Sequence, residues 1–145
     1  MKTLVVYDSL YGNTAQVAEA IGAAVAGESQ VLRIGEAKPS ELGSFELVIV
    51  GAPTQGGRPT EAMRAFLARV PALEGVKVAA FDTRLRARWV KVFGYAAGKI
   101  AESMKSLGAT LVTEPEGFIV ESKKGPLAGG ELERAGAWAK DLRPD

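Results

Sequence analysis

The sequence contains neither cysteine nor histidine in its 145 residues. Without cysteine, disulfides, zinc ribbons, iron–sulfur clusters and thiolate nucleophiles are excluded. Without histidine, the commonest metal ligand and the general base of Ser-His-Asp hydrolysis are missing. We therefore expect no metal site and no catalytic side chains of these kinds. Chemistry in this chain must rely on carboxylates, hydroxyls, backbone amides or a bound cofactor.

An excess of one charge and long apolar runs are also absent. The 18 Lys and Arg nearly balance the 17 Asp and Glu, so no overall basic field attracts nucleic acid or acidic lipid. The apolar run near the N-terminus ends at Asp8 and is too short for a signal-peptide core. No stretch approaches the ~20 apolar residues that a membrane span needs. We expect a cytoplasmic protein with no nucleic-acid or membrane partner.

Short apolar runs alternate with segments of helical period. Runs that suit strands buried on both faces lie at 4–7, 31–34, 47–50, 76–81 and 110–112, with a further run at 118–120. Apolar residues recur with helical spacing in 14–25, 60–70, 94–107 and 131–142. This alternation predicts an α/β fold with a doubly wound, five-stranded parallel sheet and helices on both faces. We expect one domain, residues 1–145, with a bend at 113–117 inside the fifth strand.

In such sheets ligands bind beyond the carboxyl ends of the strands, so the loops after the first, third and fourth strands are candidate sites. The loop after the first strand consists of Ser9, Leu10, Tyr11, Gly12, Asn13 and Thr14. Its hydroxyls and glycine precede a helix N-terminus, where unpaired amides favour an anion. The alternative is that Asn13 or Thr14 only caps the helix. The loop is neither a Walker loop nor a dinucleotide fingerprint.

The pattern Val5-Val6-Tyr7-x-Ser9-x-x-Gly12-x-Thr14-x-x-x-Ala18-x-x-Ile21 resembles the flavodoxin signature at every specified position. The order and spacing of elements along the whole chain also resemble a short-chain flavodoxin. The resemblance implies the strand order 2-1-3-4-5, binding of flavin mononucleotide (FMN) and transfer of single electrons. It further implies that residues 9–14 hold the FMN phosphate. Every donor in this loop is an amide, an Asn or a hydroxyl, so we expect a phosphate site without a cation.

The loop after the third strand contains Pro53, Thr54, Gln55, Gly56 and Gly57. From the residues alone it is a tight connection. The flavodoxin resemblance implies that it lies beside the flavin, with the Gly56 carbonyl accepting a hydrogen bond from flavin N5–H once the flavin gains an electron. Gln55 stands where many flavodoxins have Trp. It cannot stack on the ring, but its amide can hydrogen-bond the flavin edge.

The end of the fourth strand carries Asp82, Thr83 and Arg84. The resemblance implies that this segment wraps the pyrimidine end of the flavin. The candidates for stacking on its outer face are Leu85, Trp89 and Tyr95. Trp89 is preferred for its distance from Asp82, and the alternative is that it packs in the helix–sheet core.

Positive charge is concentrated around the fourth strand. Residues 77–105 hold seven basic and two acidic side chains, a charge of +5, whereas the rest of the chain holds 11 basic and 15 acidic, a charge of −4. The basic residues nearest the expected flavin are Arg84, Arg86, Arg88 and Lys91. Flavodoxins typically present an acidic rim to their partners. We therefore expect redox partners with an acidic docking face here, the alternative being an ordinary solvated loop.

The sequence thus predicts an FMN-binding electron-transfer flavoprotein that serves a reductase and an acceptor enzyme, rather than an enzyme with its own substrate. Two alternatives stay open. One is a small FMN-dependent reductase of a quinone-like acceptor. The other is a flavodoxin-like domain that has lost tight flavin binding, which Gln55 favours and the 9–14 loop opposes. A phosphoacceptor receiver domain is excluded, because Val50-Gly51-Ala52 ends the third strand where that fold needs Asp.

Overall fold

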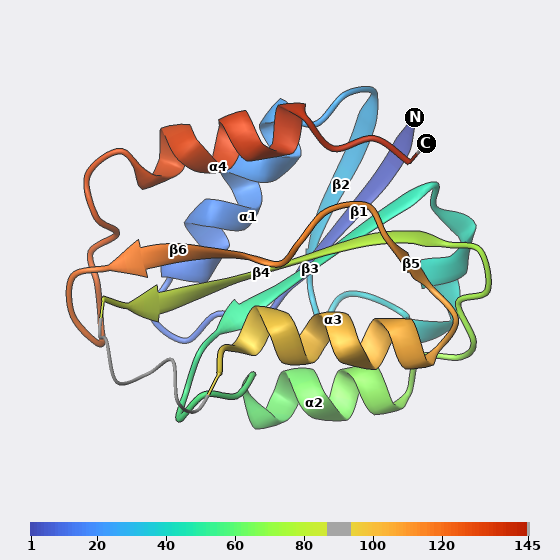
Figure 1. Ribbon diagram of the computed structural model, residues 1–145, viewed down its shortest axis with the longest axis horizontal. Helices are drawn as coiled ribbons and strands as arrows, with labels where there is room; N and C mark the ends of the chain where they lie inside the picture. The colour runs from blue at the N-terminus through green and yellow to red at the C-terminus, as the bar shows by residue number, and fades with distance from the viewer. Residues whose placement is uncertain (87–93, 145) are drawn as a thin grey trace.

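A parallel sheet lies between two layers of helices in the computed structural model, which describes residues 1–86 and 94–144 (Figure 1). The strands are β1 (Lys2–Tyr7), β2 (Glu28–Arg33), β3 (Leu47–Pro53), β4 (Lys77–Leu85), β5 (Thr110–Leu111) and β6 (Glu116–Val120). Their order is β2-β1-β3-β4-β5, with β6 also paired to β4, and every pairing is parallel. The predicted α/β fold and strand order 2-1-3-4-5 are confirmed.

The predicted fifth strand consists of two short strands on the same edge of β4. β5 pairs with the start of β4, at Lys77 and Val78, and β6 pairs with its end, from Phe81 to Leu85. The chain between them is the predicted bend. The predicted run began at Phe118, whereas β6 begins two residues earlier, at Glu116.

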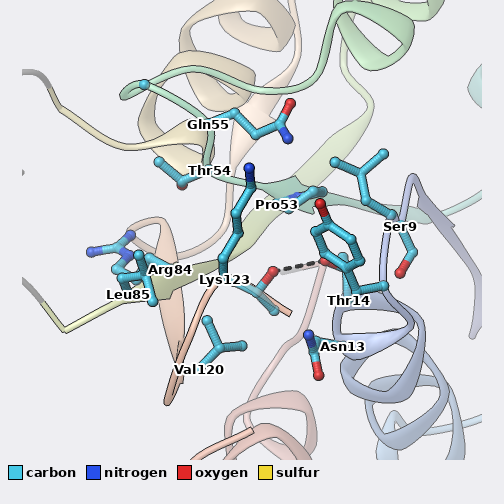
Figure 2. A pocket seen from close by; sticks show the side chains of 14 residues that line it. Ser9, Asn13, Thr14, Pro53, Thr54, Gln55, Arg84, Leu85, Val120 and Lys123 are labelled. Carbon is cyan, nitrogen blue, oxygen red and sulfur yellow. Dashed lines mark hydrogen bonds between the residues drawn. The ribbon is translucent and has the colours of Figure 1, made fainter. Parts of the chain in front are cut away.

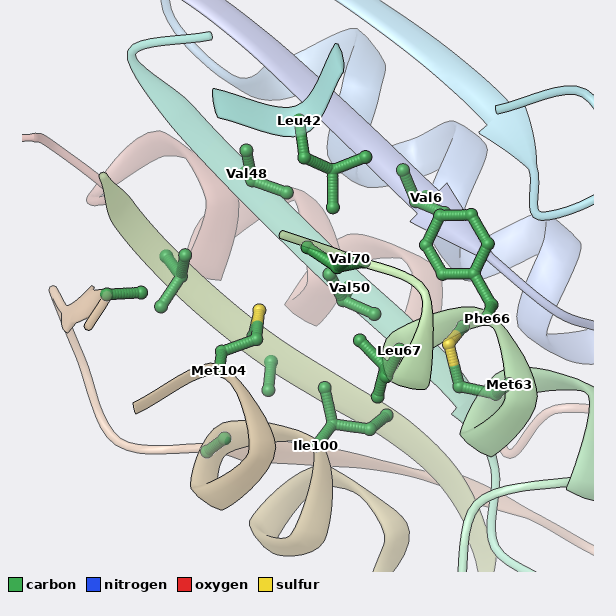
Figure 3. Close-up of a cluster of buried hydrophobic side chains, with 14 of the residues drawn as sticks. Val6, Leu42, Val48, Val50, Met63, Phe66, Leu67, Val70, Ile100 and Met104 are labelled. Carbon is green, nitrogen blue, oxygen red and sulfur yellow. The ribbon is translucent and has the colours of Figure 1, made fainter. Parts of the chain in front are cut away.

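Helices cover both faces of the sheet and bury its apolar side chains. α1 (Asn13–Ala24) and α4 (Glu131–Lys140) lie on one face, and α2 (Glu61–Ala68) and α3 (Ala96–Ser106) lie on the other (Figure 1). A 3₁₀ helix, η1 (Pro39–Ser44), precedes β3. Figure 3 shows the core under α2 and α3, where Met63 and Ile100 meet Val50 of β3. A second core joins α1 and α4 to the sheet through Ile21, Phe81 and Phe118.

One expectation about burial is wrong. The run 31–34 was predicted to lie in a strand buried on both faces, but most of β2 is exposed or half-buried. β2 lies at the edge of the sheet, so its only strand neighbour among the described residues is β1. Val31 and Leu32 therefore pack only at the margins of the two cores.

The parallel arrangement brings the candidate loops together. The carboxyl ends of β1, β3, β4 and β6 lie at the same side of the molecule (Figure 1). β4 continues to Leu85, with Asp82 and Thr83 paired to both β3 and β6, and Arg84 and Leu85 paired to β6. The sheet thus fixes the walls of any site at this edge.

Candidate functional site

A cavity of about 330 Å³ opens at this edge of the sheet (Figure 2). Most of the residues singled out from the sequence line it, namely Ser9, Leu10, Tyr11, Asn13, Thr14, Pro53, Thr54, Gln55, Gly56, Thr83 and Arg84. Three predicted residues, Gly12, Gly57 and Asp82, do not line the cavity. Trp89, the preferred candidate for stacking on the outer face of the flavin, lies outside the described residues.

Ser9 folds the first loop over the start of α1. Its Oγ accepts hydrogen bonds from the backbone N–H groups of Gly12 at 3.1 Å and Ala15 at 3.3 Å. Gly12 occupies the N-cap position with φ 94°, and no side chain caps the helix there. The alternative that Asn13 or Thr14 caps α1 is therefore wrong, because a glycine takes the left-handed conformation at this position.

The first loop presents unused donors. Within the described chain, the backbone N–H groups of Leu10, Tyr11, Asn13 and Thr14 donate to no protein acceptor. Thr14 Oγ1 and Thr83 Oγ1 lie 2.7 Å apart and form a buried hydroxyl pair that joins β4 to the loop (Figure 2). One hydroxyl of such a pair keeps a hydrogen free to donate. Free amides at a helix N-terminus are suited to an anion.

Asp8 ties this loop to the other helical layer. Its carboxylate accepts a hydrogen bond from the Thr60 hydroxyl and another, at 3.0 Å, from the N–H of Ser9. Thr60 in turn caps α2 by accepting the N–H of Met63 at 3.2 Å. No motif in the sequence connects Asp8 with Thr60, because only the tertiary fold brings these distant residues together.

The second loop is a tight two-residue turn. The backbones of Gln55 and Arg58 exchange two hydrogen bonds, of 2.8 and 3.0 Å. Gly56 and Gly57 between them have φ values of 56° and 78°, as a type I′ turn requires. Gln55 is exposed at the mouth of the cavity. Thr54 accepts the N–H of Ala96 at 3.0 Å, so this loop also fixes the start of α3.

Arg84 is held on three sides. It bonds both carboxylate oxygens of Asp82 at 2.7 Å, and its guanidinium carbon lies 3.4 Å from the centre of the Tyr95 ring. A Cβ at Gly117 would overlap the guanidinium. Asp82 is fully buried and also accepts the N–H of Ala97 at 2.9 Å, so its side chain supports Arg84 and α3. Because Arg84 covers the Tyr95 ring, Leu85 is the stacking candidate that the described cavity contains.

The cavity contains a cation that the expected phosphate loop, residues 9–14, does not itself supply. Lys123, which follows β6, lines the same cavity as the first loop, together with Val120 (Figure 2). No sequence pattern points to Lys123, because it belongs to a short polar turn with no motif and lies more than a hundred residues from loop 9–14. Its place follows from the pairing of β6 with β4.

A family model for flavodoxin matches residues 5–138. The chain belongs to the flavodoxin family. Flavodoxins are flavin-binding electron-transfer proteins, which confirms the resemblance drawn from the sequence. No curated protein matches the chain. No described helix is long and apolar enough to cross a membrane.

Solved flavodoxins share the fold over nearly the whole chain. A flavodoxin from the domain Archaea is 28% identical, with a TM-score of 0.77 and coverage of 97% of this chain and 95% of that one. Flavodoxin 1 from Bacillus cereus is 21% identical, with a TM-score of 0.80 and coverage of 99% and 100%. A short-chain flavodoxin associated with a bacterial microcompartment is 17% identical, with a TM-score of 0.70 and coverage of 97% and 95%.

The cavity suits a flavin that carries a phosphate. Loop 9–14 offers free amides to an anion, and the described lining contains no Asp or Glu that would repel one. Leu85 at the end of β4, and Gln55 and Gly56 of the turn after β3, also line the cavity and provide surface for a ring. The residues present therefore fit a phosphorylated flavin.

Proposed function

We propose that this flavodoxin binds FMN noncovalently and carries single electrons between a reductase and an acceptor enzyme in the cytoplasm. The observation that carries this proposal is the set of free backbone N–H groups of loop 9–14, which open into a cavity whose described lining contains no carboxylate. Bound FMN would supply the redox chemistry. The protein would supply binding, orientation and electrostatics.

Each part of the cavity has a role in this proposal. The amides of loop 9–14 and the Thr14–Thr83 hydroxyl pair would hold the phosphate, because charge-assisted hydrogen bonds are the strongest of their kind. The Gly56 backbone and the Gln55 amide would border one side of the ring, with Leu85 on another. Arg84, fixed by Asp82 and Tyr95, would border the ring without changing its position.

The test is a titration of the purified protein with FMN and with riboflavin, followed by absorbance and by quenching of flavin fluorescence. We expect tight FMN binding and much weaker riboflavin binding. The double variant Ser9→Ala/Thr14→Ala should lose several kcal/mol of FMN affinity, at about 1.5–3 kcal/mol for each hydrogen bond to a charged group. Equal affinity for the two flavins would contradict the role of loop 9–14. A protein that binds neither has lost its flavin site, the second alternative.

The docking partner is the finer part of the proposal. Arg84 lies in β4 and lines the cavity, and Arg86 directly follows the last residue of that strand, in a segment of strongly positive charge. We propose that redox partners present an acidic face to this segment. The reductase alternative is separated from the carrier by steady-state assays, since a reductase of quinones would turn over with a nicotinamide donor in the absence of any second protein.

A further inference from the structure

Lys123 brings a positive charge into the cavity. It lies in the turn that follows β6, and Figure 2 shows its side chain extending from this turn across the cavity in the direction of Gln55. The charged residues in the described lining are Arg84 and Lys123, both cationic. The electrostatic character of the site therefore depends on how each of these two charges is balanced.

Arg84 is already neutralised by a partner. Its guanidinium makes two hydrogen bonds to the buried Asp82 carboxylate, so the pair adds little net charge to the cavity. Lys123 forms no ion pair with any residue that the structure describes. Lys123 is thus the uncompensated charge of the described site.

The turn that carries Lys123 is fixed against loop 9–14. Lys124 Nζ lies 6.0 Å from the centre of the Tyr11 ring. Gly125 has φ 103°, and a Cβ there would lie 2.5 Å from Asn13 Oδ1, so the backbone passes directly over Asn13. The N–H of Gly125 bonds the carbonyl of Ser122 at 2.9 Å and closes the turn. The backbone of Lys123 is therefore held beside the donors that would bind the phosphate.

We propose that Lys123 is a specificity residue that pairs with the phosphate of the bound flavin and makes the cavity prefer FMN over riboflavin. This inference rests on the proposed function. Loop 9–14 supplies only neutral donors to a group that carries two negative charges, and an ammonium in a partly enclosed cavity is screened less than one in bulk water. The flexible four-carbon stem of lysine allows the ammonium to reach the loop from its neighbouring turn.

The test compares flavin affinities of the wild type, Lys123→Gln and Lys124→Gln. Lys124 is the matched control, since it lies in the same turn but contacts Tyr11 from outside the cavity lining. We expect Lys123→Gln to weaken FMN binding by about 10- to 100-fold, the value of a charged hydrogen bond. Its riboflavin affinity should stay unchanged. Lys124→Gln should leave both affinities within about twofold, and Lys123→Arg should restore the FMN preference in part.

Salt gives an independent readout of the same contact. The FMN affinity of the wild type should fall with ionic strength more steeply than that of Lys123→Gln, because the variant lacks the screened charge. An equal loss of FMN and riboflavin affinity in Lys123→Gln, or no loss of either, would overturn this inference while leaving the proposed function intact. A wild type that binds neither flavin would overturn both.

Discussion

At Gly56 the backbone takes a conformation that side chains rarely adopt. Its φ is 56°, and no heavy atom lies within 4 Å of the position that a Cβ would occupy. A side chain at this position would therefore meet open space and act almost entirely through the backbone. This makes Gly56 a suitable residue for testing whether the 54–58 turn responds to the state of the flavin.

We expect Gly56→Val to lower the first one-electron reduction potential of the FMN-loaded protein relative to the second. The left-handed conformation costs a non-glycine residue about 1–2 kcal/mol, so the carbonyl is less free to turn toward flavin N5–H after the first electron arrives. The measurement is a redox titration followed by visible absorbance. Gly35→Val is the matched control, because Gly35 also has open space around it but no positive φ. If Gly56→Val and Gly35→Val have equal one-electron reduction potentials, the turn is only a connection between β3 and α2.

Single residues of the site could be predicted where they belong to a local pattern. Ser9, Thr14 and Gly56 follow from motifs in which neighbours along the chain act together, and all three line the cavity. Lys123, and the contact between Asp8 and Thr60, could not be predicted this way. Both features depend on which segments the fold makes adjacent, and no spacing of residues along the sequence specifies this. The partnership of Arg84 with Asp82 is local but ambiguous, because either side chain has other possible partners.

Between elements, a cluster of charges connects α4 to β6. Glu131, the first residue of α4, accepts the N–H of Ile119 at 2.6 Å and two hydrogen bonds from Arg134, each of 2.8 Å. Arg134 also bonds Glu116 at 3.1 Å. The hydrogen bonds from Arg134 lower the pKa of the Glu131 carboxyl below its usual value, against the opposing effect of burial. Since β6 ends at Val120 in the cavity wall, this cluster supports the site from behind.

We expect Glu131→Gln to lower the free energy of unfolding at pH 7 by about 1.5–3 kcal/mol, the usual contribution of a hydrogen bond to a charged group. The folded-state pKa is lowered, so the stabilisation is present above the unfolded pKa and is lost as pH falls through the folded one. The difference in free energy of unfolding between wild type and variant should therefore become smaller at acid pH. Urea unfolding at pH 7 and at successively lower pH measures this difference. A gap independent of pH would show that the carboxylate charge is not what holds α4 to β6.

The elements themselves were more predictable than their burial. α1, α2, α3 and α4 each begin and end within about two residues of a segment with apolar helical period, because one face of each packs on the sheet. β2 shows the limit. Its apolar run resembles those of β1 and β3, but its exposure depends on its place at the sheet edge. An apolar run predicts a strand, whereas its neighbours decide how deeply it is buried.

Across the whole molecule, charge is distributed unevenly although the total is only +1. The segment 77–105, which includes β4 and α3, has a charge of +5, while the remaining residues carry −4. β4 ends at the cavity, so a charged reagent that approaches a bound flavin would meet the positive potential of this segment.

The sign of this potential can be measured with small oxidants of opposite charge. We expect the reduced, FMN-loaded protein to react with anionic hexacyanoferrate(III) faster at low salt than at high salt, because screening weakens the attraction beyond about 10 Å at 0.1 M. Cationic tris(phenanthroline)cobalt(III) should show the opposite trend.

Arg86→Gln combined with Arg88→Gln should reduce the salt dependence of both reactions, since it removes charge from the basic segment. Lys38→Gln combined with Lys140→Gln removes the same total charge elsewhere and should change the salt dependence less. Stopped-flow oxidation between 10 mM and 500 mM salt, which shortens the Debye length from about 30 Å to a few Å, gives the salt dependence for each of the three proteins with each of the two oxidants. A rate with the anion that rises with salt would show that the flavin edge faces negative potential, as in acidic flavodoxins, and would exclude an acidic partner docking at this segment.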